Sequence, residues 1–316
     1  MFPALGVFAT RLFGPAGSAR VVRVLSVMLV LGAAGVVGFV ATRPAPPARG
    51  ATFHPPTATP TPSPTPSPSA TPTPPPTTPP PTTKPPTAPG NYTTWALINR
   101  RTGELSGSNM AKLAFTESTV KIWLAADFLS RARAAGTPIS AADMALLQKM
   151  IRLSDDIAAD RFFARNGRFA SIDRMVKTCH LTETIPDRER QRWSKTEISP
   201  RDLARLGLCI ADGTATNPTD TAWILDQMRH VGGDGLFGIK FALPPADANV
   251  LAIKNGWYNH GFDSRWRVLC LGVHPDWVLA VISTYPSRLG RGYGEKACVD
   301  TTRLVLGLTP AATPSP

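Results

Sequence analysis

The chain has 316 residues and carries 34 Lys and Arg against 22 Asp and Glu, which gives a formal net charge of +12. The basic residues are spread along the chain without a nucleic-acid-reading motif, so we expect no nucleic-acid partner and interpret the charge as a solvated surface suited to anionic wall polymers or lipid headgroups. The histidines are scattered and the cysteines form no C-x-x-C pattern, so neither a metal site nor a cofactor is expected.

The N-terminal part contains one segment able to cross a membrane. Residues 24–41 carry no charge and follow Arg11, Arg20 and Arg23, so they suit one transmembrane helix with residues 1–23 in the cytoplasm. A cleaved signal peptide is the alternative, and its removal would make the protein secreted. No cysteine follows the segment, so a lipoprotein anchor is not expected. We therefore predict a single-pass protein of the cell membrane whose main domain lies outside the cytoplasm.

Composition divides the rest of the chain into three parts. Residues 42–90 hold about twenty of the 33 prolines, interleaved with Thr, Ser and Ala. Such a segment buries little apolar surface and is predicted to be a disordered stalk. Residues 91–308 are long enough for one sizeable core and are predicted to form the functional domain, and residues 309–316 a disordered tail.

The domain reads as strands, then helices, then strands. A hairpin is predicted over 94–107 and a buried helix over 119–134, which Gly136 terminates. Further helices are predicted over 139–153, 156–167, 199–213, 218–232 and 295–308, and strands over 250–257, 265–273 and 276–285. The last of these strands is apolar on both faces, as in a covered central strand. An N-terminal hairpin that joins a C-terminal meander around a helical block is an α+β architecture.

All four cysteines lie in this domain, and an even number outside the membrane permits two disulfides. We favour Cys179 with Cys209 and Cys270 with Cys298 among the three possible connectivities. Four buried thiols are the alternative.

Ser118 and Lys121 stand at the start of the first predicted helix. A serine there is commonly an N-cap, and this is the simpler interpretation of Ser118. A lysine at i+3 changes the chemistry, because its amine lies on the same helix face and can accept the hydroxyl proton when it is neutral. The helix N-terminus also offers N–H groups to an oxyanion.

Two further motifs follow in order. Ser154-Asp155-Asp156 stands at a loop-to-helix junction, where Ser154 could simply cap a helix, and Lys254-Asn255-Gly256 stands on a late strand. Together with Ser118 and Lys121 they match the S-x-x-K, S-D-N and K-T-G set, and this ordered set is far more specific than any one member.

On these motifs, the chain resembles the penicillin-recognising serine enzymes, in particular class A β-lactamases, D-Ala-D-Ala peptidases and secreted actinobacterial serine hydrolases. The resemblance implies a helical domain packed on an antiparallel sheet, with the active-site cleft between them. It also implies the roles of four residues: Ser118 as nucleophile, Lys121 as general base, Ser154 as proton relay to the leaving nitrogen, and Lys254 as the group that binds the substrate carboxylate.

The resemblance further implies a substrate-binding strand. Asp156, Asn255, Gly256 and Trp257 are expected to contact the substrate, and the N–H groups of Ser118 and Trp257 to form the oxyanion hole. The expected substrates are β-lactams or cell-wall peptides that end in D-Ala.

Three departures set the chain apart from class A enzymes. The Glu-x-x-x-Asn frame that serves deacylation is missing, although Glu183, Glu189 and Glu197 are candidates for its carboxylate. Asp156 replaces an Asn and is expected to favour the protonated form of Lys121. Asn255 replaces a hydroxyl residue. Two hypotheses follow: a membrane-tethered serine hydrolase or acyltransferase with slow deacylation, and a catalytically silent relative that binds wall material or a protein partner in the same cleft.

Overall fold

The structure, a computed structural model, describes residues 91–308. Within this range no helix is long and apolar enough to cross a membrane. The predicted membrane segment at 24–41, the stalk at 42–90 and the tail at 309–316 lie outside the described residues.

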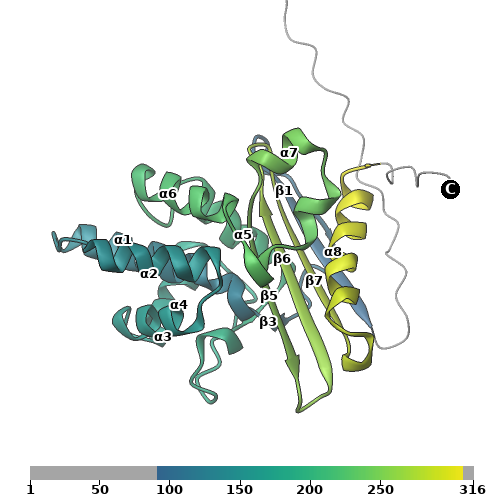
Figure 1. The fold of residues 1–316 in the computed structure, drawn as a ribbon, viewed down its shortest axis with the longest axis horizontal. Helices are drawn as coiled ribbons and strands as arrows, with labels where there is room; N and C mark the ends of the chain where they lie inside the picture. The colour runs from purple at the N-terminus through teal and green to yellow at the C-terminus, as the bar shows by residue number, and fades with distance from the viewer. Residues whose placement is uncertain (1–90, 309–316) are drawn as a thin grey trace, which may run out of the picture. The chain divides into compact units, whose positions relative to one another are not determined.

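A five-stranded antiparallel sheet forms one layer of the domain, with the order β2-β1-β7-β6-β5 (Figure 1). Its strands are β1 Tyr92–Asn99, β2 Leu105–Ser108, β5 Ala252–His260, β6 Arg265–Val273 and β7 Trp277–Pro286. The N-terminal hairpin joins the late meander through β1 and β7, in a register that places Trp95 opposite Val281. The predicted α+β sheet is therefore confirmed, including the pairing of the two chain ends.

Strand β7 is apolar on both faces because both faces are covered. Val278, Ala280 and Ile282 belong to the core shared with the helical block, whereas Leu279 and Val281 face a second core. The second core is closed by helix α8 (Arg291–Val305), which packs against β6 and β7 on the opposite side of the sheet from the helical block (Figure 1). This arrangement confirms the prediction of a covered central strand.

The helical block surrounds helix α1, which contacts each of the helices from α2 to α6. The helices of the block are α1 Lys121–Ala134, α2 Ala141–Arg152, α3 Asp156–Arg165, α4 Phe169–Thr178, α5 Pro200–Ala211 and α6 Pro218–Arg229; a short helix, α7 Pro245–Val250, lies at the end of the sheet and precedes β5 (Figure 1). The expected caps form at Ser140 and Ser199, whose side chains accept hydrogen bonds from Asp143 N and Asp202 N. Asp155, and not Ser154, caps α3, so the interpretation of Ser154 as a helix cap is wrong.

Two short strands tie the loop that follows α4 to the segment before α1. Strand β3 (Ala114–Phe115) pairs with β4 (Glu197–Ile198), and Thr116 N donates to Thr196 O at 2.8 Å. A 3-10 turn, η2 (Trp193–Lys195), precedes β4, and the Thr116 hydroxyl donates to Trp193 O at 3.3 Å. Residues 193–198 are therefore held beside the chain that enters the candidate site.

Two disulfides cross-link the elements. Cys179 at the end of α4 is bonded to Cys209 in α5, and Cys270 in β6 is bonded to Cys298 in α8. This is the pairing favoured from the sequence. The second bond links the sheet covalently to the helix that covers its outer face.

Candidate active site

Ser118 lies in a 3-10 turn, η1 (Glu117–Val120), between β3 and α1. The N-cap of this turn is Thr116, and the N-cap of α1 is Val120; neither residue makes a side-chain cap hydrogen bond. The interpretation of Ser118 as a helix cap is therefore wrong. Instead Ser118 is partly exposed on the wall of a cavity of about 390 Å³. The preceding residue, Glu117, has a φ of 46°, a left-handed conformation that costs a non-glycine residue roughly 1–3 kcal/mol and is concentrated at functional sites.

Lys121 is fully buried in the first turn of α1. Its Nζ donates to Asp156 Oδ1 at 2.6 Å and to the carbonyl oxygen of Ser154, and it lies 4.9 Å from the centroid of the Trp193 ring. Burial lowers the pKa of Lys121, while the hydrogen bond and charge of Asp156 oppose this effect. The amine is therefore placed between two influences that favour opposite protonation states.

Ser154 and Lys254 meet from different elements. Ser154 precedes α3 and has a φ of 59°, and Lys254 lies fully buried on β5. The Lys254 Nζ donates to Ser154 Oγ at 2.8 Å and to Asn255 O at 3.2 Å. Burial holds the pKa of Lys254 well below its usual value, and the nearby charge of Lys121 acts in the same direction. The structure thus brings Ser154 into contact with both buried lysines.

Asp156, the first residue of α3, lines the cavity with a largely exposed carboxylate. Its contact with Lys121 is the one expected from the S-D-D sequence. A carboxylate can only accept hydrogen bonds, so Asp156 fixes the direction of that contact.

Strand β5 passes so close to Ser118 that only glycine fits at one position. A Cβ on Gly256 would lie 2.9 Å from Ser118 N and 3.0 Å from Thr116 O. Trp257, the next residue, lines the cavity. Asn255 is fully buried, and its Nδ2 donates to Gly235 O at 3.0 Å and to Phe237 O at 2.8 Å. Its amide nitrogen is committed to backbone carbonyls, and Asn255 is not among the residues that line this cavity.

The three glutamates considered for deacylation lie elsewhere. The Glu183 carboxylate accepts from Ser199 Oγ and from Arg201, Glu189 is exposed in a turn, and Glu197 is in β4. None of them lines the cavity that contains Ser118.

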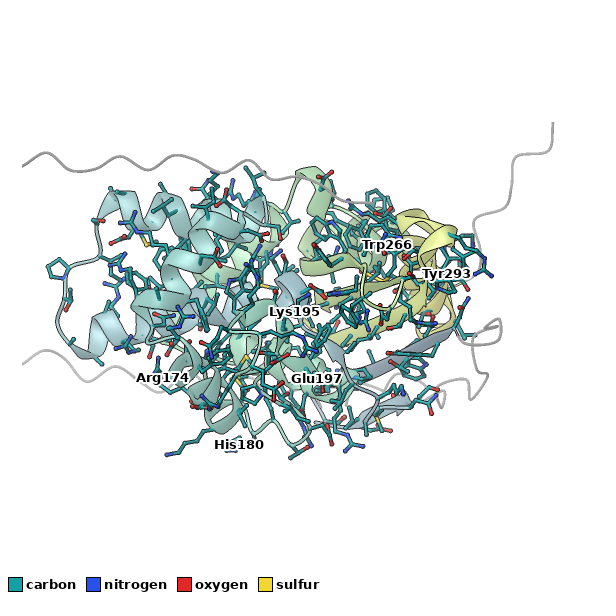
Figure 2. The ribbon with its side chains drawn as sticks, turned by 90° about the horizontal axis from the view of Figure 1, so that it is seen from below. Arg174, His180, Lys195, Glu197, Trp266 and Tyr293 are labelled. Carbon is teal, nitrogen blue, oxygen red and sulfur yellow. A yellow bond between two sulfur atoms is a disulfide. The ribbon has the colours of Figure 1, made fainter. Side chains whose placement is uncertain are left out.

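Other functional candidates were missed in the sequence. Glu117 and His260 form a buried pair with Oε1 and Nε2 2.7 Å apart, and the Nδ1 of His260 lies 3.0 Å from the Nζ of Lys195. Lys195 lies near the middle of the molecule, where the helical block meets the sheet (Figure 2). The sequence did contain a signal for His260. Lys254, Gly256 and His260 are an even number of positions apart along one strand, so their side chains are expected on the same face.

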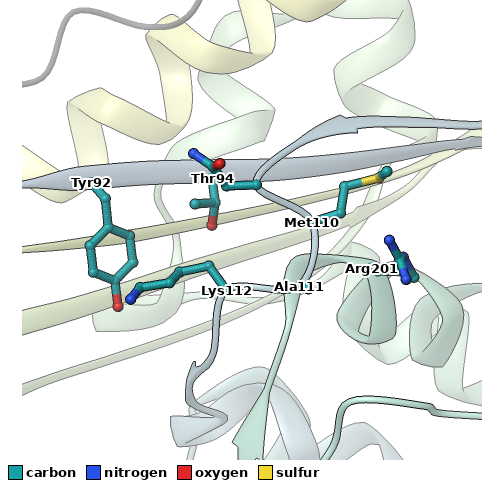
Figure 3. A pocket seen from close by; sticks show the side chains of 7 residues that line it. Tyr92, Thr94, Met110, Ala111, Lys112 and Arg201 are labelled. Atoms are coloured by element: carbon teal, nitrogen blue, oxygen red, sulfur yellow. The ribbon is translucent and has the colours of Figure 1, made fainter.

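A second hollow of about 580 Å³ lies beside β1 and the loop after β2 (Figure 3). It is lined by Tyr92, Thr94, Asn109, Met110, Ala111, Lys112 and Arg201. It contains none of the motif residues, so the cavity at Ser118 is the candidate active site.

The fold and the meeting of the three motifs define the class: this is the architecture of the penicillin-recognising serine enzymes. The structure is similar to that of the TLA-1 extended-spectrum β-lactamase, with a TM-score of 0.59 and 14% identity over 68% of this chain and 92% of the other. It is also similar to PBP-A, with a TM-score of 0.56 and 17% identity over 70% of this chain and 90% of the other. A class A β-lactamase of Mycobacterium abscessus gives a TM-score of 0.54 and 16% identity over 69% of this chain and 94% of the other. At these identities the likeness concerns the fold.

The chain belongs to the beta-lactamase enzyme family, whose model matches residues 135–292, half of the chain. The matched range begins after Ser118 and Lys121. A protein of Mycobacterium bovis and one of Mycobacterium tuberculosis, both named "Putative lipoprotein LppW", are 30% identical over 183 residues. The match covers 56% of this chain and only 57% of the length of these relatives.

Proposed function

We propose that the protein is an extracytoplasmic acyl-serine enzyme that is acylated at Ser118 by β-lactams or by cell-wall peptides ending in D-Ala. The observation that carries this proposal is the contact of Ser154 with Lys121 and Lys254, beside the cavity that contains Ser118. Two buried lysines are costly to the fold, and a site that retains both is best explained by their chemistry.

Acylation would proceed in balanced steps. Ser118 Oγ attacks the carbonyl carbon while the neutral Lys121 amine accepts the hydroxyl proton. The N–H groups of Ser118 and Trp257 stabilise the oxyanion. The proton taken up by Lys121 is then passed through Ser154 to the leaving nitrogen as the C–N bond breaks, which returns Lys121 to its neutral form. Lys254, which is hydrogen-bonded to Ser154 Oγ, binds the substrate carboxylate.

Release of the acyl group is expected to be slow. Hydrolysis needs a base beside the ester, and both carboxylates that line the cavity are already engaged, Glu117 with His260 and Asp156 with Lys121. A persistent acyl-enzyme suits a peptidase or acyltransferase better than an enzyme that destroys β-lactams.

The location fits this chemistry. Disulfides persist in oxidising compartments, and the similar mycobacterial proteins are named as lipoproteins. All four cysteines of this chain form disulfides, so attachment would depend on residues 24–41 rather than on a lipid-modified cysteine.

A silent relative is the second candidate, and one contact favours it. Two of the three N–H groups of the Lys121 ammonium are engaged, by Asp156 and by Ser154 O, and this arrangement favours the protonated amine over the base that Ser118 needs. In that case the cavity would bind wall material or a protein partner without acylation.

Intact-protein mass spectrometry of the full chain with benzylpenicillin separates the two candidates. A stable adduct in the wild type that is absent from Ser118→Ala supports the acyl-serine enzyme. Absence of an adduct in a folded wild-type protein would reject acylation by this substrate class and leave the silent relative.

A further inference from the structure

One wall of the active-site cavity carries two cations that the proposed acylation does not use. The charged residues lining the cavity are Glu117, Asp156, Arg192 and Lys195. Both acids have a cationic or imidazole partner, Lys121 for Asp156 and His260 for Glu117. Each carboxylate that lines the cavity is thus already in contact with a basic side chain of the protein.

The two cations are not compensated in this way. Among the side chains of residues 91–308, no carboxylate forms an ion pair with Arg192 or with Lys195. Two nearby arginines differ in this respect, because Arg190 is paired with Asp187 and Arg267 with Asp263. Burial is the largest cause that lowers the pKa of Lys195; the charge of Glu117 opposes it, and the charges of Arg267, Arg192 and Arg190 lower it further. Neither Arg192 nor Lys195 is thus held by a direct carboxylate contact, so their N–H groups are available to an anion.

Lys195 is held in a defined position. Its Nζ contacts His260 Nδ1 at 3.0 Å and lies 4.8 Å from the centroid of the Tyr258 ring and 5.1 Å from that of Phe115. An Nε2–H on His260 that donates to Glu117 leaves Nδ1 free to accept from the ammonium. A lysine ammonium has three protons, so two remain for a ligand.

Strand β5 shows on which side of Ser118 this wall lies. Lys254, which contacts Ser154, stands at one end of the strand, and His260, which contacts Lys195, stands at the other. At about 3.3 Å per residue these ends are roughly 20 Å apart. Gly256, which packs against Ser118 N, lies between them.

The direction of the substrate follows from this order. In the proposed reaction the leaving nitrogen is beside Ser154 and the carbonyl carbon is at Ser118. The remaining part of the substrate, its acyl group, then extends toward Tyr258 and His260 and reaches the wall formed by residues 192–195. The pairing of β3 with β4 fixes that wall next to the nucleophile.

We propose that Arg192 and Lys195 form an anion subsite that binds a carboxylate on the acyl portion of the substrate. This inference rests on the proposed acylation of Ser118 and specifies its substrate class: acyl donors with a second negative charge, distinct from the carboxylate on the leaving-group side. The Glu117–His260 pair acts as a positioning device for Lys195.

A matched pair of probes tests the subsite on the full chain. Carbenicillin is benzylpenicillin with one added carboxylate on the acyl side chain. The second-order rate constant of acylation at Ser118 is measured for both by intact mass, and the ratio is the readout. We expect the wild type to favour carbenicillin by about fivefold or more, and high salt to reduce this preference.

Variants locate the effect. Arg192→Gln/Lys195→Gln should bring the ratio to about one, whereas Arg188→Gln should keep the wild-type ratio, because Arg188 is exposed and paired with Asp173. Circular dichroism of each variant confirms folding. The ratio, unlike a single rate, is insensitive to a general loss of active protein.

Three other outcomes would reject the anion subsite, and the last of them would also reject the proposed acylation. Equal rates for the two penicillins, with a Ser118 adduct formed, would reject the subsite and leave the proposed function intact. A Lys195→Gln change that alters adduct lifetime but not the ratio would reject it too and assign Lys195 to deacylation. No adduct with either probe would reject the acylation and the subsite together.

Discussion

Asp156→Asn is the substitution that most directly tests the assignment of Lys121 as a base. Lys121 can accept the Ser118 proton only when its amine is neutral. Burial favours that neutral form, and Asp156, with its Oδ1 2.6 Å from Nζ, opposes it. An asparagine at this position keeps the hydrogen-bonding oxygen and removes the charge.

The size of the effect follows from Coulomb's law. Two unit charges at this separation attract by about 1.6 kcal/mol in a medium with the dielectric constant of water. The water limit is the suitable one because the Asp156 side chain is 67% exposed, although Lys121 is fully buried. Removal of the charge should therefore lower the pKa of Lys121, and since about 1.4 kcal/mol is a factor of ten in an equilibrium constant, the neutral fraction should rise about tenfold.

The assay is the pH dependence of acylation by benzylpenicillin. An acidic partner raises a lysine pKa, so its loss should move the acidic limb of the profile to lower pH. Below that limb the rate should rise about tenfold, because the neutral fraction of Lys121 rises by that factor. An unchanged profile, with the adduct still on Ser118, would refute the role of Lys121 as the titrating base.

Three further predictions concern the support of the site. Gly256→Ala should reduce acylation at least about tenfold and cost about 1–3 kcal/mol of stability in urea unfolding, whereas Gly261→Ala, with no atom within 4 Å of its added Cβ, should do neither. Lys254→Met should abolish acylation yet raise the unfolding free energy by about 1–4 kcal/mol at neutral pH. Because the folded-state pKa of Lys254 lies below 10.5, wild-type stability should rise with pH up to that value, and this slope should flatten in the variant. Replacing Cys270 and Cys298 by alanine should cost about 3.6 kcal/mol in the same assay, from the entropy of a loop whose ends are 28 residues apart.

Much of the fold could be predicted because its signals are local. Alternation and caps place the strands and most helices, and the apolar run of β7 indicates a strand covered on both sides. Helix α4 was missed because its cap residue, Arg168, has a φ of 56° and makes no side-chain cap, so no start signal exists. Strands β3 and β4 have two residues each and exist only through their pairing with one another.

The motif residues of the site were predictable for a different reason. The spacing of Ser118 and Lys121 is fixed by one helical turn, and the match of Ser154-Asp155-Asp156 to the S-D-N motif implied that Asp156 lies near Lys121. The cationic wall was not predictable in this way. Lys195 reaches the cavity only because β4 pairs with β3, and this contact joins residues about 80 positions apart in the chain.

Two features of the cavity, its engaged carboxylates and its cationic wall, favour the same chemistry. An ester at Ser118 is hydrolysed when a carboxylate activates water, and here Glu117 is fixed by His260 and Asp156 by Lys121. The proposed anion subsite would bind the acyl group of an anionic donor beside Ser118. We therefore infer that the site retains its acyl group until an acceptor other than water arrives, so the acyl-enzyme should decay faster with a D-amino acid or amino-terminated wall peptide than in buffer alone.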